Sequence, residues 1–484
     1  MNNLFSGMVW KFVERIAAQL VSFLVSVILA RILMPEQYGI IAKVTVFIAI
    51  ADVFVSVGLG SALVQKKDSD DLDFSSIFCL DMVMSIILYG ILFAMSPYIS
   101  YFFNDPDLTN VLRVLGIKLL FSAYMSIQQA YISRHMIFRA SAIVTFIATV
   151  CSAVVGIIMA HSGKGVWALV SQQLTMSVSQ VLLLTLILKW RPRIQFSWKR
   201  SKEMLTYGNL ILLAGILDTI SSQFRTLIVG KFYTDEELAY YNRGDLYPQT
   251  LIGSISGTMH TVLFAAYSKE QKNLTVIKAM VRKGIQRGSF LVFTMLTGLA
   301  MVAEPFVRLM LTEKWMPCVP FLQIGCIGYA TWVIQIVEQE AIQGLGYAKD
   351  YLLITMVRVM FNLIAVFILA RYGVMAIAMG AVATSFLSSF LVCRWTYKHL
   401  HYNIKEQIQD LSPAIFVSIC IAVAVSIVSR IPLPDLTLLI LEIFAGIGVC
   451  IVMCVLTKNE AFYWIIYKIK DTLKNLISRK VKMK

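Results

Sequence analysis

Charged residues inside long apolar stretches are the residues of this sequence most able to do chemistry. A charge in such a stretch is costly in free energy, so it usually marks a binding site or a pathway for a polar solute. Four residues stand near the middle of their stretches, namely Asp52, Lys118, Asp218 and Arg358, and Arg225 lies in the outer half of its stretch. An ammonium or guanidinium group there would bind an anion such as a diphosphate, the guanidinium through two hydrogen bonds. We therefore take these five residues as candidates for substrate binding in a polar cavity.

The same charges could instead hold helices together. Asp218 and Arg225 lie two helical turns apart on one face, where each could pair with a neighbouring helix. An unpaired buried charge is destabilising, so such pairs would be structural rather than functional. Both roles stay open at this point, and we favour substrate contact most for Arg225, Lys118 and Arg358.

Residue sets typical of enzymes and metal sites are absent from the sequence. No Walker A motif occurs, the 8 Cys residues include no C-x-x-C pair, and His135, His161 and His260 lie far apart. The pattern predicts neither nucleotide hydrolysis nor a zinc site nor a disulfide framework. We expect no enzymatic activity, no cofactor and no metal ion.

The elements that carry the charges are apolar stretches long enough to cross a membrane. The chain of 484 residues is 58% hydrophobic and has a mean hydropathy of +0.74. About 20 apolar residues span a bilayer as a helix. We expect about fourteen such helices, at 11–33, 38–63, 75–100, 108–131, 139–161, 165–189, 208–232, 244–266, 284–311, 316–343, 349–371, 374–397, 412–431 and 436–457. The sequence thus predicts an all-α polytopic protein with membrane lipids around it.

Basic residues indicate the orientation of these helices. They gather in the connections that follow even-numbered stretches, such as Lys66, Arg134, Arg200 and Lys278, whereas the odd connections hold isolated ones. Lys and Arg favour the cytoplasmic side of a membrane. We therefore expect both termini in the cytoplasm. The net charge of +15 comes largely from these loops, so it does not indicate binding to nucleic acid.

Three charged residues stand nearer the outer ends of their stretches: Lys43, Arg243 and Asp245. Long side chains in such places reach the lipid headgroups at little cost. We expect these three residues at the membrane surface.

Two faint internal echoes divide the chain into parallel halves. Segment 28–43 resembles 228–244, and segment 156–170 resembles 366–380. Chance similarity of apolar segments would also explain them. If they are genuine, the lobes are 1–190 (spans 1–6) and 208–400 (spans 7–12), joined by a cytoplasmic linker at 191–207 and enclosing a cavity. Spans 13 and 14 at 412–457 would be accessory, followed by a basic amphipathic cytoplasmic tail at 458–484.

Three segments carry a resemblance to a known family. They are SVILARILMPEQYGIIAKVTVFIAIADVFVSVGLGSALVQKKD (26–68), GKGVWALVSQQ (163–173) and YYNRGDLYPQTLIGSISGTMHTVLFAAYSKEQ (240–271). They resemble bacterial polysaccharide exporters of the Wzx type, close to the colanic-acid exporter branch of the multidrug/oligosaccharidyl-lipid/polysaccharide (MOP) superfamily. The resemblance implies two six-span lobes plus two C-terminal helices, in the bacterial inner membrane. It also implies that cavity cations receive the diphosphate and sugars of an undecaprenyl-diphosphate-linked oligosaccharide.

We therefore expect a flippase that moves such lipid-linked repeat units by alternating access. It would serve the synthesis of capsule, O-antigen in lipopolysaccharide, or exopolysaccharide, with a polysaccharide polymerase and glycosyltransferases as further partners. Two alternatives stay open. One is a cation-coupled multidrug exporter of the same superfamily. The other is a membrane glycan polymerase or ligase, which needs a long external loop, whereas the outward connections here are short.

Overall fold

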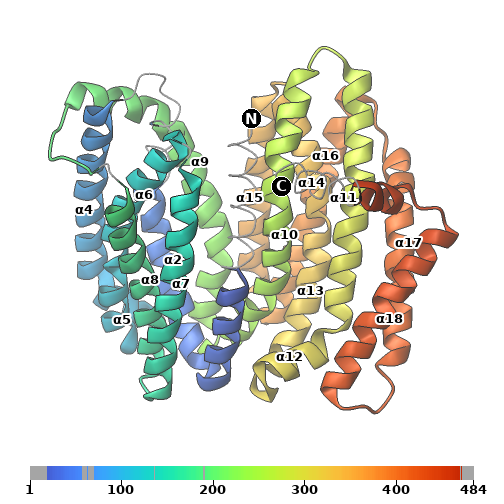
Figure 1. The fold of residues 1–484 in the computed structure, drawn as a ribbon, viewed down its shortest axis with the longest axis horizontal. Coiled ribbons are helices and arrows are strands. Elements are labelled where there is room, and N and C mark those ends of the chain that lie inside the picture. Colours follow the sequence, from blue (N-terminus) through green and yellow to red (C-terminus); the bar gives the residue numbers. More distant parts are fainter. Residues whose placement is uncertain are drawn as a thin grey trace, which may run out of the picture. The chain divides into compact units, whose positions relative to one another are not determined.

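The fold is helical throughout the part of the chain that the computed structural model describes, which is residues 19–56, 63, 70–135, 137–188, 191–468 and 470. Every regular element in these residues is a helix (Figure 1), so the expected all-α class is confirmed. The chain forms two compact units, residues 1–239 and 240–484. The division into lobes at 1–190 and 208–400 stays a prediction.

The first unit begins with the helix Gln19–Ile32. It continues with α2 (Pro35–Ser56), α4 (Asp71–Phe103), α5 (Asp107–Gly116), α6 (Lys118–His135), α7 (Phe138–His161), α8 (Val166–Ile187) and α9 (Trp198–Phe232). Helix α7 packs along α8, α4 packs on α5 and α6, and α9 packs on α2 and α4. Fully buried Leu29, Leu112 and Leu115 belong to the apolar core of this unit.

The connection before α9 is fastened to the start of α4. Asp70 and Asp73 form a capping box that satisfies backbone N–H groups at the N-terminus of α4. Both carboxylates also bind the Arg200 guanidinium, and the Arg193 backbone N–H donates to Ser75 Oγ. Helix α9 begins at Trp198, so the second half of the expected 191–207 linker is helical.

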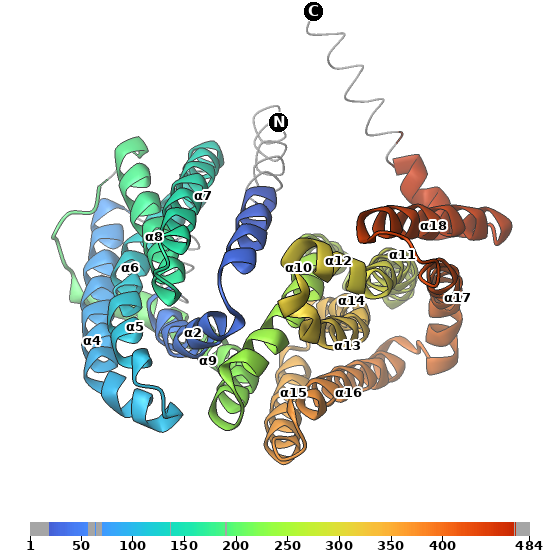
Figure 2. The same ribbon diagram turned by 90° about the horizontal axis from the view of Figure 1, so that it is seen from below.

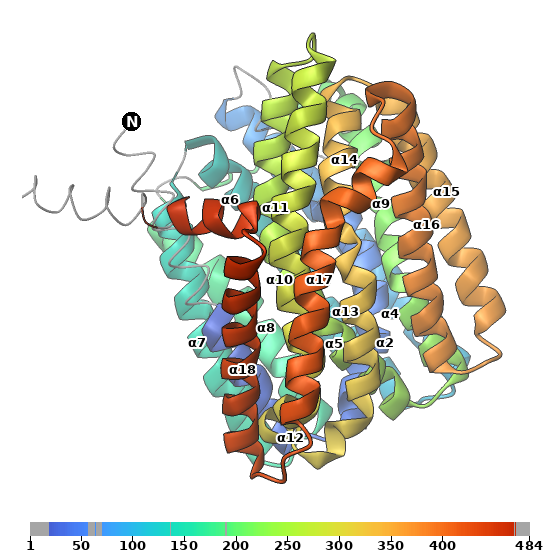
Figure 3. The same ribbon diagram turned by 90° about the vertical axis from the view of Figure 1, so that its right-hand side faces the viewer.

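The second unit holds the remaining helices. They are α10 (Asp235–Lys269), whose first turn belongs to the first unit, α11 (Leu274–Met301), α12 (Ala303–Leu311), the 3₁₀ helix η1 (Glu313–Cys318), α13 (Val319–Ala330), α14 (Trp332–Gly344), α15 (Ala348–Leu369), α16 (Val374–Leu400), α17 (Ile404–Val428) and α18 (Asp435–Leu456). Helix α17 packs on both α11 and α18, and Figures 2 and 3 show α17 beside α18. The stretches expected as spans 13 and 14 therefore pack onto the α11 side of this unit.

Ten helices in the described part of the chain are long and apolar enough to cross a membrane. The number becomes eleven if α11 and α12, which bend by 64° at their junction, form one broken span. Helices α9 and α10 are each 35 residues long but carry polar side chains such as Asp218, Arg225 and His260, so they are less apolar than the others. The chain is a multi-pass membrane protein, and the count of fourteen spans stays a prediction.

The tail expected at 458–484 lies only partly within the described residues. Residues 460–468 are helical. Phe462 packs edge-on against buried Phe290 of α11, and Ile465 packs against the same apolar cluster. The Arg287 guanidinium lies 4.0 Å from the centroid of the Trp464 ring. This short segment therefore folds back onto its own unit, with Tyr463 and Tyr467 exposed.

Candidate functional site

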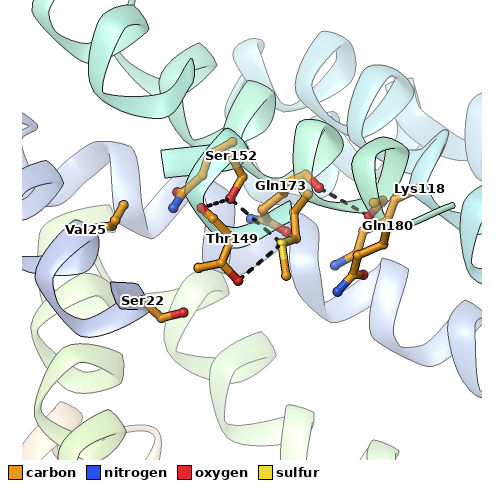
Figure 4. Close-up of a pocket in the computed structure, with 10 residues that line it drawn as sticks. Ser22, Val25, Lys118, Thr149, Ser152, Gln173 and Gln180 are labelled. Atoms are coloured by element: carbon orange, nitrogen blue, oxygen red, sulfur yellow. Dashed lines mark hydrogen bonds between the residues drawn. The ribbon is translucent and has the colours of Figure 1, made fainter. Parts of the chain in front are cut away.

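A polar pocket lies inside the first unit, among helices that are otherwise apolar (Figure 4). Its cavity volume is about 320 Å³. Four helices line it: Gln19–Ile32, the start of α6, and the middles of α7 and α8. The lining residues are Ser22, Val25, Lys118, Thr149, Ser152, Gln172, Gln173, Met176, Ser177 and Gln180. Seven of these ten residues carry a hydroxyl or carboxamide group.

Close packing of α7 on α8 places the α8 side chains in this wall. A Cβ added at Gly156 of α7 would lie 3.1 Å from Cβ of Gln172, so a larger residue would push the helices apart. The tight turn between the helices uses Gly163 and Gly165 at φ values of 70° and 54°, a left-handed region that glycine adopts without strain. Side chains at 172, 173, 176, 177 and 180 then share one side of α8, because helical neighbours are three or four residues apart.

The hydroxyl groups of the wall are mostly bonded within their own helices. Thr149 Oγ1 donates to the Thr145 carbonyl at 2.7 Å, Ser152 Oγ to the Thr149 carbonyl at 2.9 Å, and Ser177 Oγ to the Gln173 carbonyl at 3.2 Å. Their oxygens keep lone pairs that can accept a hydrogen bond from a ligand. These hydroxyls are thus satisfied as donors and keep acceptor capacity for a ligand.

The three carboxamides and the ammonium group of Lys118 differ from these hydroxyls. Within the described part of the chain, the side chains of Gln172, Gln173, Gln180 and Lys118 have no hydrogen bond or ion pair to protein. Each carboxamide offers two donors and an acceptor, and the ammonium offers three donors. The pocket therefore presents many unused hydrogen-bonding groups and one positive charge, which suits a hydroxyl-rich ligand with an anionic substituent.

Of the five residues expected to bind substrate, Lys118 alone lines this pocket. Asp52 is on α2, where its Oδ2 accepts from Ser56 Oγ at 3.4 Å. Asp218 and Arg225 are both on α9, exposed and half-buried respectively. Arg358 is a half-buried residue of α15 in the second unit. Substrate contact by these four residues stays a proposal.

The glutamines of α8 are site residues that the charge-based reasoning missed. A signal was present, because Gln172, Gln173 and Gln180 recur on one side of an apolar span. Burying an unbonded carboxamide is costly, so several on one face of a membrane helix indicate a polar lining.

The expectation that Lys43 lies at the lipid headgroups is wrong. Its side chain is 5% exposed, and its ammonium lies 2.5 Å from Asp235 and 3.5 Å from Asp105. Burial raises the pKa of the Asp235 carboxyl, and the nearby Lys43 ammonium opposes that rise. The partners of Lys43 are thus not lipid headgroups but two carboxylates, that of Asp105 between α4 and α5 and that of Asp235 at the start of α10.

The corresponding expectation for Arg243 in the second unit is also wrong. Arg243 is 6% exposed. Its guanidinium lies 5.4 Å from the ring centroid of Trp315 and 5.9 Å from that of Tyr247. Aromatic faces attract a cation within about 6 Å, so these rings hold the guanidinium inside the protein. Asp245, the third residue of this set, is half-buried and accepts a hydrogen bond from the Tyr329 hydroxyl at 3.0 Å.

A second polar region lies in the second unit, and its groups are bonded to one another. Gln335 of α14 is 4% exposed. Its Nε2 lies within 3.2 Å of Thr331 Oγ1, Ser385 Oγ and Ser389 Oγ, and its Oε1 accepts from Ser388 Oγ at 3.0 Å. This set joins α14 to α16, and we call it the Gln335 network.

A charged cluster joins α11 to α17 in the same unit. Asp410 binds Arg282 through two hydrogen bonds of 2.7 and 2.8 Å. It also accepts from Gln286 at 2.7 Å and from the Tyr402 hydroxyl at 2.8 Å. Its side chain is 4% exposed. We call this set the Asp410 cluster; it fastens α17 to the rest of its unit.

Comparison with known proteins agrees with the resemblance seen in the sequence. The profile of the family described as "Polysaccharide biosynthesis protein" matches residues 28–320, which is more than half of the chain. The chain is 22% identical over 279 residues to the teichuronic acid biosynthesis protein TuaB of Bacillus subtilis, covering 57% of this chain and 58% of that protein. It is 22% identical over 324 residues to the lipopolysaccharide biosynthesis protein WzxC of Escherichia coli, covering 66% of each chain. These matches thus cover less than two thirds of each relative.

The fold is also similar to that of a solved membrane transporter. The structure of the lipid II flippase MurJ in an inward closed conformation aligns with a TM-score of 0.77 at 13% sequence identity, covering 93% of this chain and 98% of that one. At this identity the likeness establishes the fold alone. Because the family profile covers more than half of the chain, the chain belongs to the polysaccharide biosynthesis protein family.

Proposed function

We propose that this protein is a flippase that moves undecaprenyl-diphosphate-linked oligosaccharides across the bacterial inner membrane by alternating access. The product would enter capsule, O-antigen or exopolysaccharide. Family membership and the functions named for TuaB and WzxC support this proposal. The observation that carries it is the pocket of unpaired carboxamides beside Lys118 within a membrane-spanning unit.

The pocket chemistry suits transport of sugars. A sugar that leaves water loses hydrogen bonds, and the carboxamides of Gln172, Gln173 and Gln180 can replace them. The net free energy of such an exchange is small, because each hydrogen bond to protein replaces one to water. A transported group must bind firmly enough to enter and weakly enough to leave. A wall of neutral amides meets both conditions better than a cluster of charges.

Further parts of the proposal concern the other charged residues and the partners. Arg225 and Arg358 would contact the diphosphate, and Asp218 and Asp52 would line the same path. A polymerase and glycosyltransferases would supply and consume the lipid-linked repeat unit. The protein itself would have no catalytic activity.

Deletion followed by complementation tests the proposed function. Cells that lack the protein should lose surface polysaccharide and accumulate the lipid-linked repeat unit in the inner leaflet, and expression of the wild-type chain should restore both. Normal surface polysaccharide together with increased drug sensitivity would instead indicate a multidrug exporter.

Cysteine labelling tests the proposed orientation, with both termini in the cytoplasm. Ile194 is 95% exposed in the connection before α9, and Lys164 lies on the exposed turn between α7 and α8. In a variant without other cysteines, Ile194→Cys should resist a membrane-impermeant maleimide added to intact cells, whereas Lys164→Cys should react. The reverse pattern would contradict the orientation.

A further inference from the structure

The charge of the pocket is small. Among the described residues that line it, Lys118 is the one charged residue, and the remaining polar side chains are neutral. A diphosphate carries more than one negative charge and is usually bound by several cations or by the fork of a guanidinium. One ammonium group offers a point charge without that fork. The pocket is therefore better matched to a single carboxylate than to a diphosphate.

The charge also lies at one end of the pocket. Figure 4 shows Lys118 beside Gln180 at one end, Gln173, Thr149 and Ser152 in the middle, and Ser22 with Val25 at the other end. A ligand that fills it would place an anionic substituent at the first end and neutral hydroxyl groups along the middle. The volume of about 320 Å³ lies at the small end of ligand pockets, so it suits one or two sugar rings.

The pocket side chains that have no hydrogen bond to protein also match a sugar that carries a carboxylate. The carboxamides of Gln173 and Gln180 can each donate to and accept from ring hydroxyls. Val25 and Met176 add apolar surface against which a sugar ring can pack. An ammonium and a carboxylate form a charge-assisted hydrogen bond, which is stronger than the bonds between neutral groups.

We propose that this pocket binds an acidic sugar of the transported repeat unit, with the sugar carboxylate at Lys118 and the ring hydroxyls at Gln173 and Gln180. The inference rests on the proposed function. It assigns the pocket to the glycan and not to the diphosphate. Lys118 would then determine specificity among repeat units, since the diphosphate is common to all of them.

Binding to the purified full-length chain in detergent tests the site directly. The probes are methyl glucuronide, methyl glucoside and inorganic pyrophosphate, and the readout is the midpoint of thermal unfolding. Methyl glucuronide should raise the midpoint of the wild type more than methyl glucoside does, because the two differ in one carboxylate. Lys118→Met should remove that difference, and Lys118→Arg should retain it. A shift by pyrophosphate that depends on Lys118, or equal shifts by the two sugars, would contradict the proposal.

Export in cells gives a second and independent readout. In a strain without its own exporter, surface polysaccharide is measured for two repeat units that differ only in a hexuronate or the matching hexose. Lys118→Met should lower the ratio of acidic to neutral export roughly ten-fold, because hydrogen bonds to charged groups are worth about that factor or more. Lys164→Met, on the exposed turn, is the matched control and should leave the ratio unchanged.

The outcomes separate the two proposals. If Lys118→Met lowers export of both repeat units equally, Lys118 binds a group common to both, and the acidic-sugar site is refuted while the flippase function stands. If the wild type exports neither repeat unit but still prefers methyl glucuronide, the binding site stands and the flippase function fails.

Discussion

Glutamine side chains have different surroundings in the two units of this protein. In the first unit, Gln173 and Gln180 face a pocket, and their carboxamides have no protein partner within the described residues. In the second unit, the carboxamide of Gln335 is bonded to hydroxyl groups of Thr331, Ser385, Ser388 and Ser389. The glutamine carboxamide thus has unused hydrogen-bonding groups at the pocket of the first unit, whereas in the Gln335 network its hydrogen bonds are made to neighbouring hydroxyls.

The hydrogen-bond partners of each glutamine indicate its role. A saturated buried group has no capacity for a ligand, and removing it leaves its partners unsatisfied. A free group contributes little to folding but can bind a solute. We therefore expect the Gln335 network and the Asp410 cluster to determine the amount of folded protein. We expect the pocket to determine how much substrate each folded molecule moves.

The largest effect on stability should follow replacement of Asp410. Asp410→Ala removes four hydrogen bonds, from Arg282 (two), Gln286 and Tyr402. We expect destabilisation of about 3 kcal/mol, because the Arg282 guanidinium loses both short hydrogen bonds to a carboxylate and keeps only the Glu406 carboxylate at 3.9 Å. The amount of protein in membranes and the thermal unfolding midpoint would both fall.

A neighbouring ion pair provides the control for Asp410. Glu406 binds Lys278 at 2.9 Å, and both side chains are about one quarter exposed, 26% and 25% respectively. Glu406→Ala should cost about 1–2 kcal/mol, less than Asp410→Ala, because water screens the ion pair with Lys278 while the Asn403 N–H of the capping box also loses its acceptor. Equal losses in the two variants would show that the Asp410 cluster is not a special point of attachment for α17.

A smaller loss of stability is expected from Gln335. Gln335→Leu leaves the hydroxyl of Ser388 without its acceptor and removes the donor to Ser389. The expected cost is about 1–3 kcal/mol. Export per folded molecule should stay normal, which quantitative immunoblotting combined with a glycan assay would reveal. Reduced export per molecule would contradict the structural role of this network.

The smallest change in stability is expected at the contact between α7 and α8. Gly156→Ala places a Cβ 3.1 Å from that of Gln172, so the helices must separate slightly. Gly90→Ala in α4 is the control, because nothing lies within 4 Å of the added atom. Gly90→Ala should stabilise the protein by about 0.5–1 kcal/mol through helix propensity. Gly156→Ala should lack this gain and lower export. The same gain in both variants would mean that α7 and α8 are not closely packed here.

The helical class could be predicted from sequence because a bilayer demands long apolar helices. The helices α9 and α10 show the limit of that reasoning. Residues such as Asp218, Arg225 and His260 lower their hydropathy, so hydropathy alone does not establish whether these helices span. The buried positions of Lys43 and Arg243 could not be predicted, because their partners Asp235 and Trp315 are distant in sequence.

The candidate site was predictable only in part. Lys118 could be found because an isolated charge in an apolar stretch is visible in sequence. The glutamines were not separable from structural ones, because Gln173 and Gln335 look alike until their neighbours are known. Packing of α16 against α14 saturates Gln335, whereas the pocket leaves Gln173 open. This distinction depends on tertiary contacts, which composition and periodicity do not contain.

The most direct test of the central claim is the transport rate of a double variant, Gln173→Leu with Gln180→Leu, in reconstituted liposomes. The rate of movement of a lipid-linked oligosaccharide between leaflets is measured per folded molecule, beside Gln335→Leu as the comparison. We predict that the free energy of unfolding of the double variant stays within about 0.5 kcal/mol of the wild-type value. We also predict that its transport rate falls roughly ten-fold or more, because two amides that bind the sugar are lost. A double variant that transports at the wild-type rate, or that fails to fold while Gln335→Leu folds normally, would contradict the central claim.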